Sequence, residues 1–136
     1  KFTDAEIEEL ARRIRKMKEQ GTHLCCSIGF LTEKQAKILK DAGLDRINHN
    51  LNSSRAYYHN ICTTHTFEQR VANIRMLQGL GFEICSGGIM VWVKAKRTSW
   101  ICFWSCVDPA GALPINFLLP IKGTPLGDAD ISGLTT

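Results

Sequence analysis

The chain has 136 residues, 44% of them apolar and 22% charged, which is typical of one globular domain. Its net charge is only +4, and no Lys/Arg run interleaved with aromatic residues indicates a nucleic-acid partner. No apolar stretch approaches the roughly 18 residues of a membrane span, so no membrane partner is expected. Six cysteines without a secretory signal favour thiols or metal ligands over disulfides, and we expect a cytoplasmic location.

The first predicted unit is a helix followed by a short buried strand. Residues 3–6, Thr-Asp-Ala-Glu, form a capping box, in which the Thr hydroxyl and the Glu carboxylate bind each other's backbone N–H groups. Gly21 is the predicted end of this helix, and residues 23–30 form the predicted strand. Apolar residues recur at helical spacing between them: Ile7, Leu10, Ala11, Ile14 and Met17.

The same order occurs twice more along the chain. Capping boxes at 32–35 and 66–69 open helices that end at Gly43 and Gly81, and strands are predicted over 45–51 and 82–90. Helices that alternate with short strands are typical of parallel β/α repeats. Such repeats build either an open sheet or a (β/α)8 barrel, and a whole barrel needs roughly 200 residues or more. The periodicity therefore leaves a small complete α/β domain or part of a barrel.

Polar side chains alternate along the second predicted strand. A period of two places Asn48, Asn50 and Asn52 on one face. A buried amide without a partner costs about 1–3 kcal/mol, so three in a row require a ligand or an internal network. The alternative is a loop in which the Asn side chains cap turns.

Two cysteines occupy matching places, Cys25 in the first strand and Cys85 in the third. Strand ends converge on the active site in parallel α/β folds, where thiolates are ligands for soft metals and iron–sulfur clusters. The alternative is that both are small buried apolar residues, because no CxxC pair is present. Gly87-Gly88 permits either close approach of a ligand or only a tight turn. Cys62, just before the third capping box, is interpreted as structural, and the alternative is a metal pair of Cys62 and His65.

Several strings together resemble the biotin synthase family, which is part of the radical S-adenosylmethionine (SAM) enzymes. They are AGLDRINHNLNSSRAYYHNICTTHTFEQR (42–70), EICSGGIM (83–90), LPINFLLPIKGTPL (113–126) and CCSIGFLTEKQAKILKDAGLD (25–45). The resemblance implies an α/β fold in which residues 1–136 are a partial (β/α)8 TIM-type barrel of about four β/α units. It also implies a homodimer.

The family inserts sulfur into dethiobiotin to form biotin by a 5′-deoxyadenosyl radical mechanism. The resemblance implies a 4Fe-4S cluster that reduces SAM and a 2Fe-2S cluster that is thought to donate the sulfur. Cys25 and Cys85 match two cysteine ligands of the 2Fe-2S cluster. Asn50 and Asn116 match residues that bind dethiobiotin, and Asn52 matches a residue that contacts the SAM ribose.

The CxxxCxxC motif that holds the family's 4Fe-4S cluster does not occur in this sequence. The resemblance places a further cysteine ligand before Lys1 and an arginine ligand after Thr136. We therefore expect this segment to be inactive by itself and to act within a longer enzyme. The alternatives are a non-functional truncated or frame-shifted gene product, or a part of another radical SAM barrel enzyme.

Residues 91–109 differ from their surroundings. Residues 91–107 hold all three tryptophans and three basic residues without an acid, and have no clean amphipathic period. If the codons of this segment are read one base earlier, and any third base that the genetic code permits is allowed, the segment from Val91 reads GVGESEEDILDLLLVLR. This string has the pattern of a Gly-rich turn followed by an acidic amphipathic helix. The sequence thus predicts a pair of compensating frame errors, the second near 109–111. The alternative is a genuine Trp-rich insertion.

Overall fold

The structure is a computed structural model that describes residues 2–89, 111–116, 119–125 and 127–128. Helices and parallel strands alternate in the predicted order: α1 (Asp4–Lys18), β1 (Cys25–Cys26), α2 (Glu33–Asp41), β2 (Arg46–Asn48), α4 (Phe67–Gly79) and β3 (Glu83–Cys85). A short helix, α3 (Tyr58–Ile61), precedes α4. Strands β4 (Gly88–Ile89) and β5 (Ile115–Asn116) form a separate parallel pair. None of the helices in these ranges combines the length and the apolar character that crossing a membrane requires.

All three predicted capping boxes are present. Thr3, Thr32 and Thr66 each accept a hydrogen bond from the backbone three residues on, and the side chain at that position accepts from the cap backbone in return. The three glycines that end the predicted helices have positive φ angles, of 72° at Gly21, 94° at Gly43 and 79° at Gly81. These signals are local in the sequence, which explains why the helix ends agree with the prediction.

The core lies between the helices and one face of the sheet. Ile47 of β2 is fully buried and Ile84 of β3 is 2% exposed, and the apolar stripes of the helices pack against them. Each such side chain contributes about 1.5–3 kcal/mol when it is fully buried. The predicted stripe of α1 is correct at Ile7, Ala11 and Ile14, which are buried, and at Leu10, which is partly buried against the core, but wrong at Met17, which is 47% exposed.

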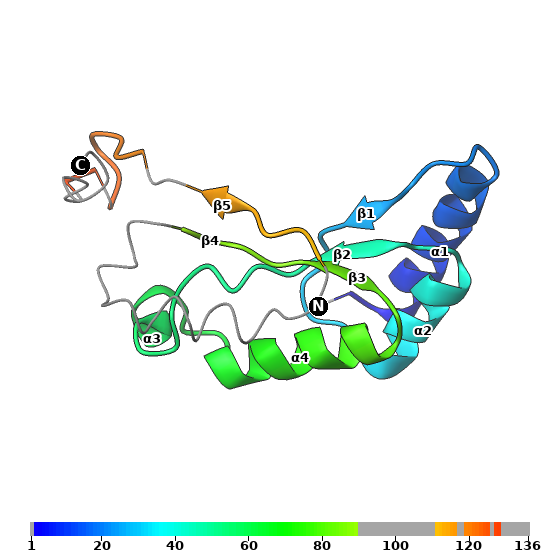
Figure 1. Ribbon diagram of the computed structural model, residues 1–136, viewed down its shortest axis with the longest axis horizontal. Coiled ribbons are helices and arrows are strands. Elements are labelled where there is room, and N and C mark those ends of the chain that lie inside the picture. The colour runs from blue at the N-terminus through cyan, green and yellow to red at the C-terminus, as the bar shows by residue number, and fades with distance from the viewer. Residues whose placement is uncertain (1, 90–110, 117–118, 126, 129–136) are drawn as a thin grey trace.

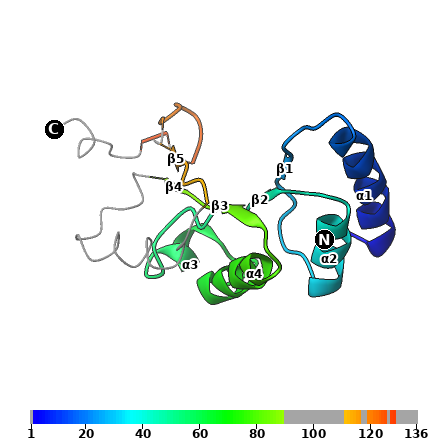
Figure 2. The same ribbon diagram turned by 45° about the vertical axis from the view of Figure 1, so that its right-hand side comes forward.

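The strand order is β1-β2-β3, all parallel, with α1, α2 and α4 on one side of the strands (Figure 1). After a turn of 45° the helices still lie outside the strands, on the right and below (Figure 2). No helix of the described residues covers the other face. The α/β class with parallel strands is confirmed, whereas closure into a (β/α)8 barrel stays a prediction.

Candidate functional site

The uncovered face of the sheet carries the polar strand residues. The register sets Cys25 level with Arg46, and Asn48 level with Cys85. Residues that are level across a sheet point to the same face, and so do residues two apart on one strand. These four side chains therefore share the face opposite to the buried Ile47.

The two cysteines of this face are electrostatically coupled. Partial desolvation of the thiol and the neighbouring Cys85 raise the pKa of Cys25. Cys26, level with Ile47, points the other way and packs against the core. Two thiols on one face are a donor set that suits an iron–sulfur cluster. Within the described ranges, no group of three or more His, Cys, Asp and Glu side chains could hold a metal ion, so this pair forms at most a part of a ligand set.

Asn50 follows β2 and is held at both its side chain and its backbone. Its Oδ1 accepts from the Gly87 backbone N–H at 3.0 Å, and its backbone carbonyl accepts from Arg70 Nε at 2.8 Å. The amide NH₂ group of Asn50 has no acceptor among the residues that the structure describes. Asn50 is therefore an oriented carboxamide with two donors to offer.

Asn52 does not continue the alternation that the sequence predicts. Its φ is +65°, its N–H donates to Gly87 O at 2.9 Å, and it is level with Gly88. Asn48 is level with Cys85 and Asn52 with Gly88, so four residue steps along the first segment lie opposite three along the second. The first segment therefore contains one extra residue, which is a β-bulge. The interpretation of three amides on one face is thus corrected at Asn52, because the extra residue shifts the register.

Asn116 reaches the same region from the far end of the chain. It lies in β5, level with Ile89 of β4, and its side chain is exposed. Ala112 is level with Cys85, so alternation along both strands puts Asn116 on the face that Cys85 occupies. A Cβ at Gly87 would lie 1.9 Å from Pro114 O, so only glycine permits this close approach of the two segments.

Two arginines near the site were not predicted from the sequence. Arg46 Nη2 lies 2.6 Å from Glu83 Oε2, beside both cysteines, and Arg70 holds the Asn50 carbonyl. The alternation of side chains along β2 that indicates Asn48 also indicates Arg46, which lies two residues earlier on the same face. Nothing local in the sequence indicates Arg70, because its partner lies 20 residues away. Three serine hydroxyls near the bulge and the double glycine are buried without a partner among the described residues: Ser53, Ser54 and Ser86.

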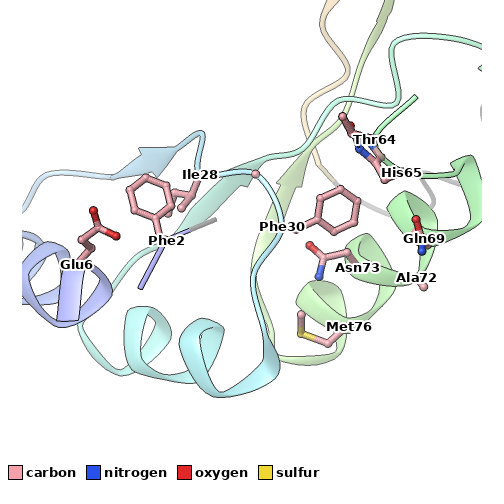
Figure 3. A pocket seen from close by; sticks show the side chains of 11 residues that line it. Phe2, Glu6, Ile28, Phe30, Thr64, His65, Gln69, Ala72, Asn73 and Met76 are labelled. Carbon is pink, nitrogen blue, oxygen red and sulfur yellow. Dashed lines mark hydrogen bonds between the residues drawn. The ribbon is translucent and has the colours of Figure 1, made fainter. Parts of the chain in front are cut away.

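A separate hollow of about 920 Å³ lies on the helix side of the sheet (Figure 3). Phe2 and Glu6 form one wall, Phe30 lies opposite, and Asn73 and Met76 of α4 close another side. None of the five predicted site residues lines it. The site on the uncovered face is therefore distinct from this hollow.

Comparisons with known proteins agree with these observations. A relative named "Biotin synthase" from Methylacidiphilum infernorum (isolate V4) is 40% identical over 125 residues, which cover 90% of this chain and 40% of the relative. A "Biotin synthase" from Aquifex aeolicus (strain VF5) is 37% identical and is covered to 39%. The chain thus spans about two fifths of the length of these relatives.

A solved structure titled "Crystal structure of methylornithine synthase (PylB)" superposes with a TM-score of 0.74 at 19% identity, covering 88% of this chain and 36% of the other. At that identity the likeness concerns the fold alone. Residues 2–94 match the family described as Radical SAM superfamily. This match covers more than half of the sequence, and the chain belongs to the radical SAM superfamily.

Proposed function

We propose that this chain is a part of a biotin synthase, and that its uncovered sheet face lines the reaction site for sulfur insertion into dethiobiotin. The observation that carries the proposal is that the register puts Cys25 and Cys85 on one face, while Asn50 binds the backbone of Gly87, two residues after Cys85. The 40% identity to a biotin synthase over 90% of the chain supports it independently.

In this proposal Asn50 and Asn116 bind the ureido ring of dethiobiotin. A ureido group offers both donors and acceptors, and so does a carboxamide. The Oδ1 of Asn50 is already bound to the Gly87 N–H, so its NH₂ group donates to the ureido oxygen. Asn116, which is exposed, accepts from the ring N–H groups. Asn52 contacts the SAM ribose from the bulge, where its positive φ turns it out of the strand.

Cys25 and Cys85 supply two thiolate ligands to the proposed 2Fe-2S cluster, which when bound serves as the source of sulfur. Burial and the nearness of Cys85 raise the pKa of Cys25, which disfavours its thiolate form. Arg46 lies beside both sulfurs and its positive charge favours the thiolate form. The remaining ligands, the 4Fe-4S cluster and the SAM-cleaving motif belong to other parts of the proposed enzyme.

A segment exchange tests the proposal. Residues 2–89 would replace the matching segment of the Aquifex aeolicus relative, and biotin formation from dethiobiotin would be measured after cluster reconstitution. We expect the chimera to form biotin, and Asn50→Ala to reduce the rate by about five- to thirtyfold, because one lost hydrogen bond to a bound polar group costs about 1–2 kcal/mol. Asn60→Ala, on the exposed side of α3, is the matched control.

Two outcomes contradict the proposal as a whole, and a third contradicts the role of Asn50 alone. A chimera that binds both clusters but forms no biotin would favour another radical SAM reaction for this segment. A chimera that folds but loads no 2Fe-2S cluster would favour the alternative of a gene product without activity. A chimera in which Asn50→Ala and Asn60→Ala behave alike would remove Asn50 from the substrate site.

A further inference from the structure

A cluster of polar and nucleophilic side chains surrounds Cys62, away from the site described above. Cys62 follows α3 and lies four residues before Thr66, the residue that caps α4. Its side chain is half-buried, and Tyr58, Thr64 and His65 contact one another beside it. Figure 3 shows Thr64 and His65 beside Phe30, among the residues that line the hollow of about 920 Å³.

The contacts in this cluster define one consistent set of donors and acceptors. Tyr58 Oη lies 2.9 Å from His65 Nε2, and Thr64 Oγ1 lies 2.9 Å from His65 Nδ1. If the Tyr58 hydroxyl donates to Nε2, the Nδ1–H donates to Thr64 Oγ1. The Thr64 hydroxyl then donates to Cys62 Sγ, 3.5 Å away. In this arrangement the sulfur receives a hydrogen bond from a hydroxyl that His65 orients, and His65 Nδ1 itself lies 3.4 Å from the sulfur.

The surroundings of the sulfur favour its anionic form. The Thr64 hydroxyl, the backbone N–H groups of Thr64 and His65, and the positive charge of Arg70 together lower the pKa of Cys62. Burial has the opposite effect at Cys25 and Cys26, whose pKa values are raised. At neutral pH the thiolate is therefore more populated at Cys62 than at either of these two residues.

The sulfur is also accessible to a small molecule. A second hollow, of about 450 Å³, is lined by Cys62, Thr64 and His65 together with the basic side chains of Arg55 and His59. Reactive cysteines in proteins share these features: a lowered pKa, a position near a helix N-terminus or a cation, and partial exposure. Glu68 also lines this hollow and pairs with Arg55 at 3.0 Å, so its rim carries both positive and negative side chains.

We propose that Cys62 is a site of reversible S-thiolation by small disulfides, for which oxidised glutathione is the probe. The Cys62 thiolate attacks one sulfur of the disulfide, and a new bond forms between Cys62 Sγ and that sulfur. The sulfur–sulfur bond of the probe breaks at the same time, and the second glutathione leaves as a thiolate that takes a proton from water. One cysteine is oxidised and one glutathione is reduced, so no further oxidant is needed.

The test uses the full 136-residue chain with oxidised glutathione at pH 7. The rate of mixed-disulfide formation at each cysteine would be measured by peptide mass spectrometry, and each rate divided by that of the same cysteine in urea. We expect the normalised rate at Cys62 to exceed those at Cys25 and Cys26 by at least about tenfold. A Cys62 rate no higher than in the urea-unfolded chain overturns the proposal, as does faster reaction at Cys26.

Substitutions at the hydroxyl test the arrangement itself. Thr64→Val removes the donor to Cys62 and should lower the rate at Cys62 several-fold, whereas Thr64→Ser keeps the donor and should preserve the rate. Thr63→Val, at the exposed neighbour, is the matched control. Equal rates in Thr64→Val and Thr64→Ser would contradict the role of the hydroxyl. If Thr64→Val fails to fold, the wild-type ratio and the Thr64→Ser rate still decide the proposal.

Discussion

The Asn50 side chain has two ends with different tasks. Its Oδ1 joins the end of β2 to the double glycine by accepting from the buried Gly87 N–H, and its NH₂ group has no acceptor among the described residues. Arg70 fixes the backbone of the same residue from α4. One residue therefore both connects two strands and offers donors to a ligand, and a pair of substitutions can separate the two tasks.

We expect Asn50→Ala to lower the free energy of unfolding by about 1–2 kcal/mol, because the buried Gly87 N–H loses its acceptor. Asn50→Asp keeps an acceptor oxygen and should stay within about 0.5 kcal/mol of the wild type, while it loses both donors. Urea unfolding monitored by circular dichroism measures the difference. In the chimera, Asn50→Asp should still weaken dethiobiotin binding. Equal destabilisation by both variants would show that the Gly87 contact does not hold the strands.

His49 links stability to pH. It is 1% exposed, its ring nitrogens have no partner among the described residues, and Phe30 packs edge-on against it at 5.2 Å between ring centroids. Burial first, then the charges of Arg70 and His65, lower the pKa of His49 from 6.5 to about 4. The unfolded chain therefore binds more protons than the folded chain between these two pH values.

The contribution of His49 to the free energy of unfolding should therefore be complete above pH 6.5. It should decrease as the pH falls toward 4, by up to about 3 kcal/mol. Urea unfolding at several pH values measures the slope. His49→Phe keeps an aromatic ring beside Phe30 and removes the titrating group, so its stability should change less over the same window. His49→Gln is a second variant in case the larger ring does not fit. Parallel curves for wild type and both variants would contradict the assignment.

Residues of the candidate site could be predicted from the sequence only where strand alternation holds. Cys25, Asn48 and Cys85 share a face as a period of two requires. Asn52 departs from it because a bulge inserts one residue, and a bulge leaves no local signature in this sequence. Arg70 depends on packing between α4 and the end of β2, which local patterns do not contain.

At the scale of the elements, helix beginnings were predicted correctly and strand lengths were not. A capping box lies within four residues, so the sequence alone indicates where α1, α2 and α4 begin. A strand ends where its neighbour stops pairing, which depends on distant segments. The predicted strand over 82–90 accordingly divides into β3 and β4, separated at Ser86-Gly87.

The capping box of α2 does more than begin a helix. Gln35 closes the box with Thr32 and also donates from Nε2 to Phe2 O at 3.1 Å and to Asp4 Oδ1 at 3.0 Å. We expect Thr32→Ala to lower the free energy of unfolding by about 1 kcal/mol, and Thr32→Ser to retain most of it. Gln35→Glu should be more harmful, because a carboxylate would then face Asp4. Urea unfolding of the three variants checks this order, which the reverse ranking would contradict.

At the scale of the whole molecule, one face of the sheet packs against helices, and no helix of the described residues covers the other face (Figure 1). The sequence contains no CxxxCxxC motif, and the chain spans about two fifths of the length of these relatives. We therefore expect the reconstituted 136-residue chain to release no 5′-deoxyadenosine from SAM. In the chimera, Cys85→Ala should remove the 2Fe-2S absorption but keep 5′-deoxyadenosine formation. Loss of both in that variant would argue for collapse of the fold rather than loss of one ligand.

Residues 91–107 lie outside the described residues. The predicted pair of frame errors would change the charge and the apolar pattern of this segment. Replacing it with GVGESEEDILDLLLVLR changes its net charge from +3 to −4 and that of the chain from +4 to −3. The replacement substitutes an amphipathic helix pattern, with apolar residues grouped for burial, for three scattered tryptophans.

We expect the replaced chain to unfold at a higher temperature and over a narrower range than the chain as written, because a helix with one apolar stripe completes a β/α unit. Thermal unfolding by circular dichroism compares the two, and a scrambled version of the 17 residues controls for composition alone. The nucleotide sequence over 90–111 tests the origin directly, since the frame prediction requires one insertion or deletion near each end of the segment. A more stable chain as written, together with an intact reading frame in related genes, would instead identify the tryptophan-rich stretch as a genuine insertion.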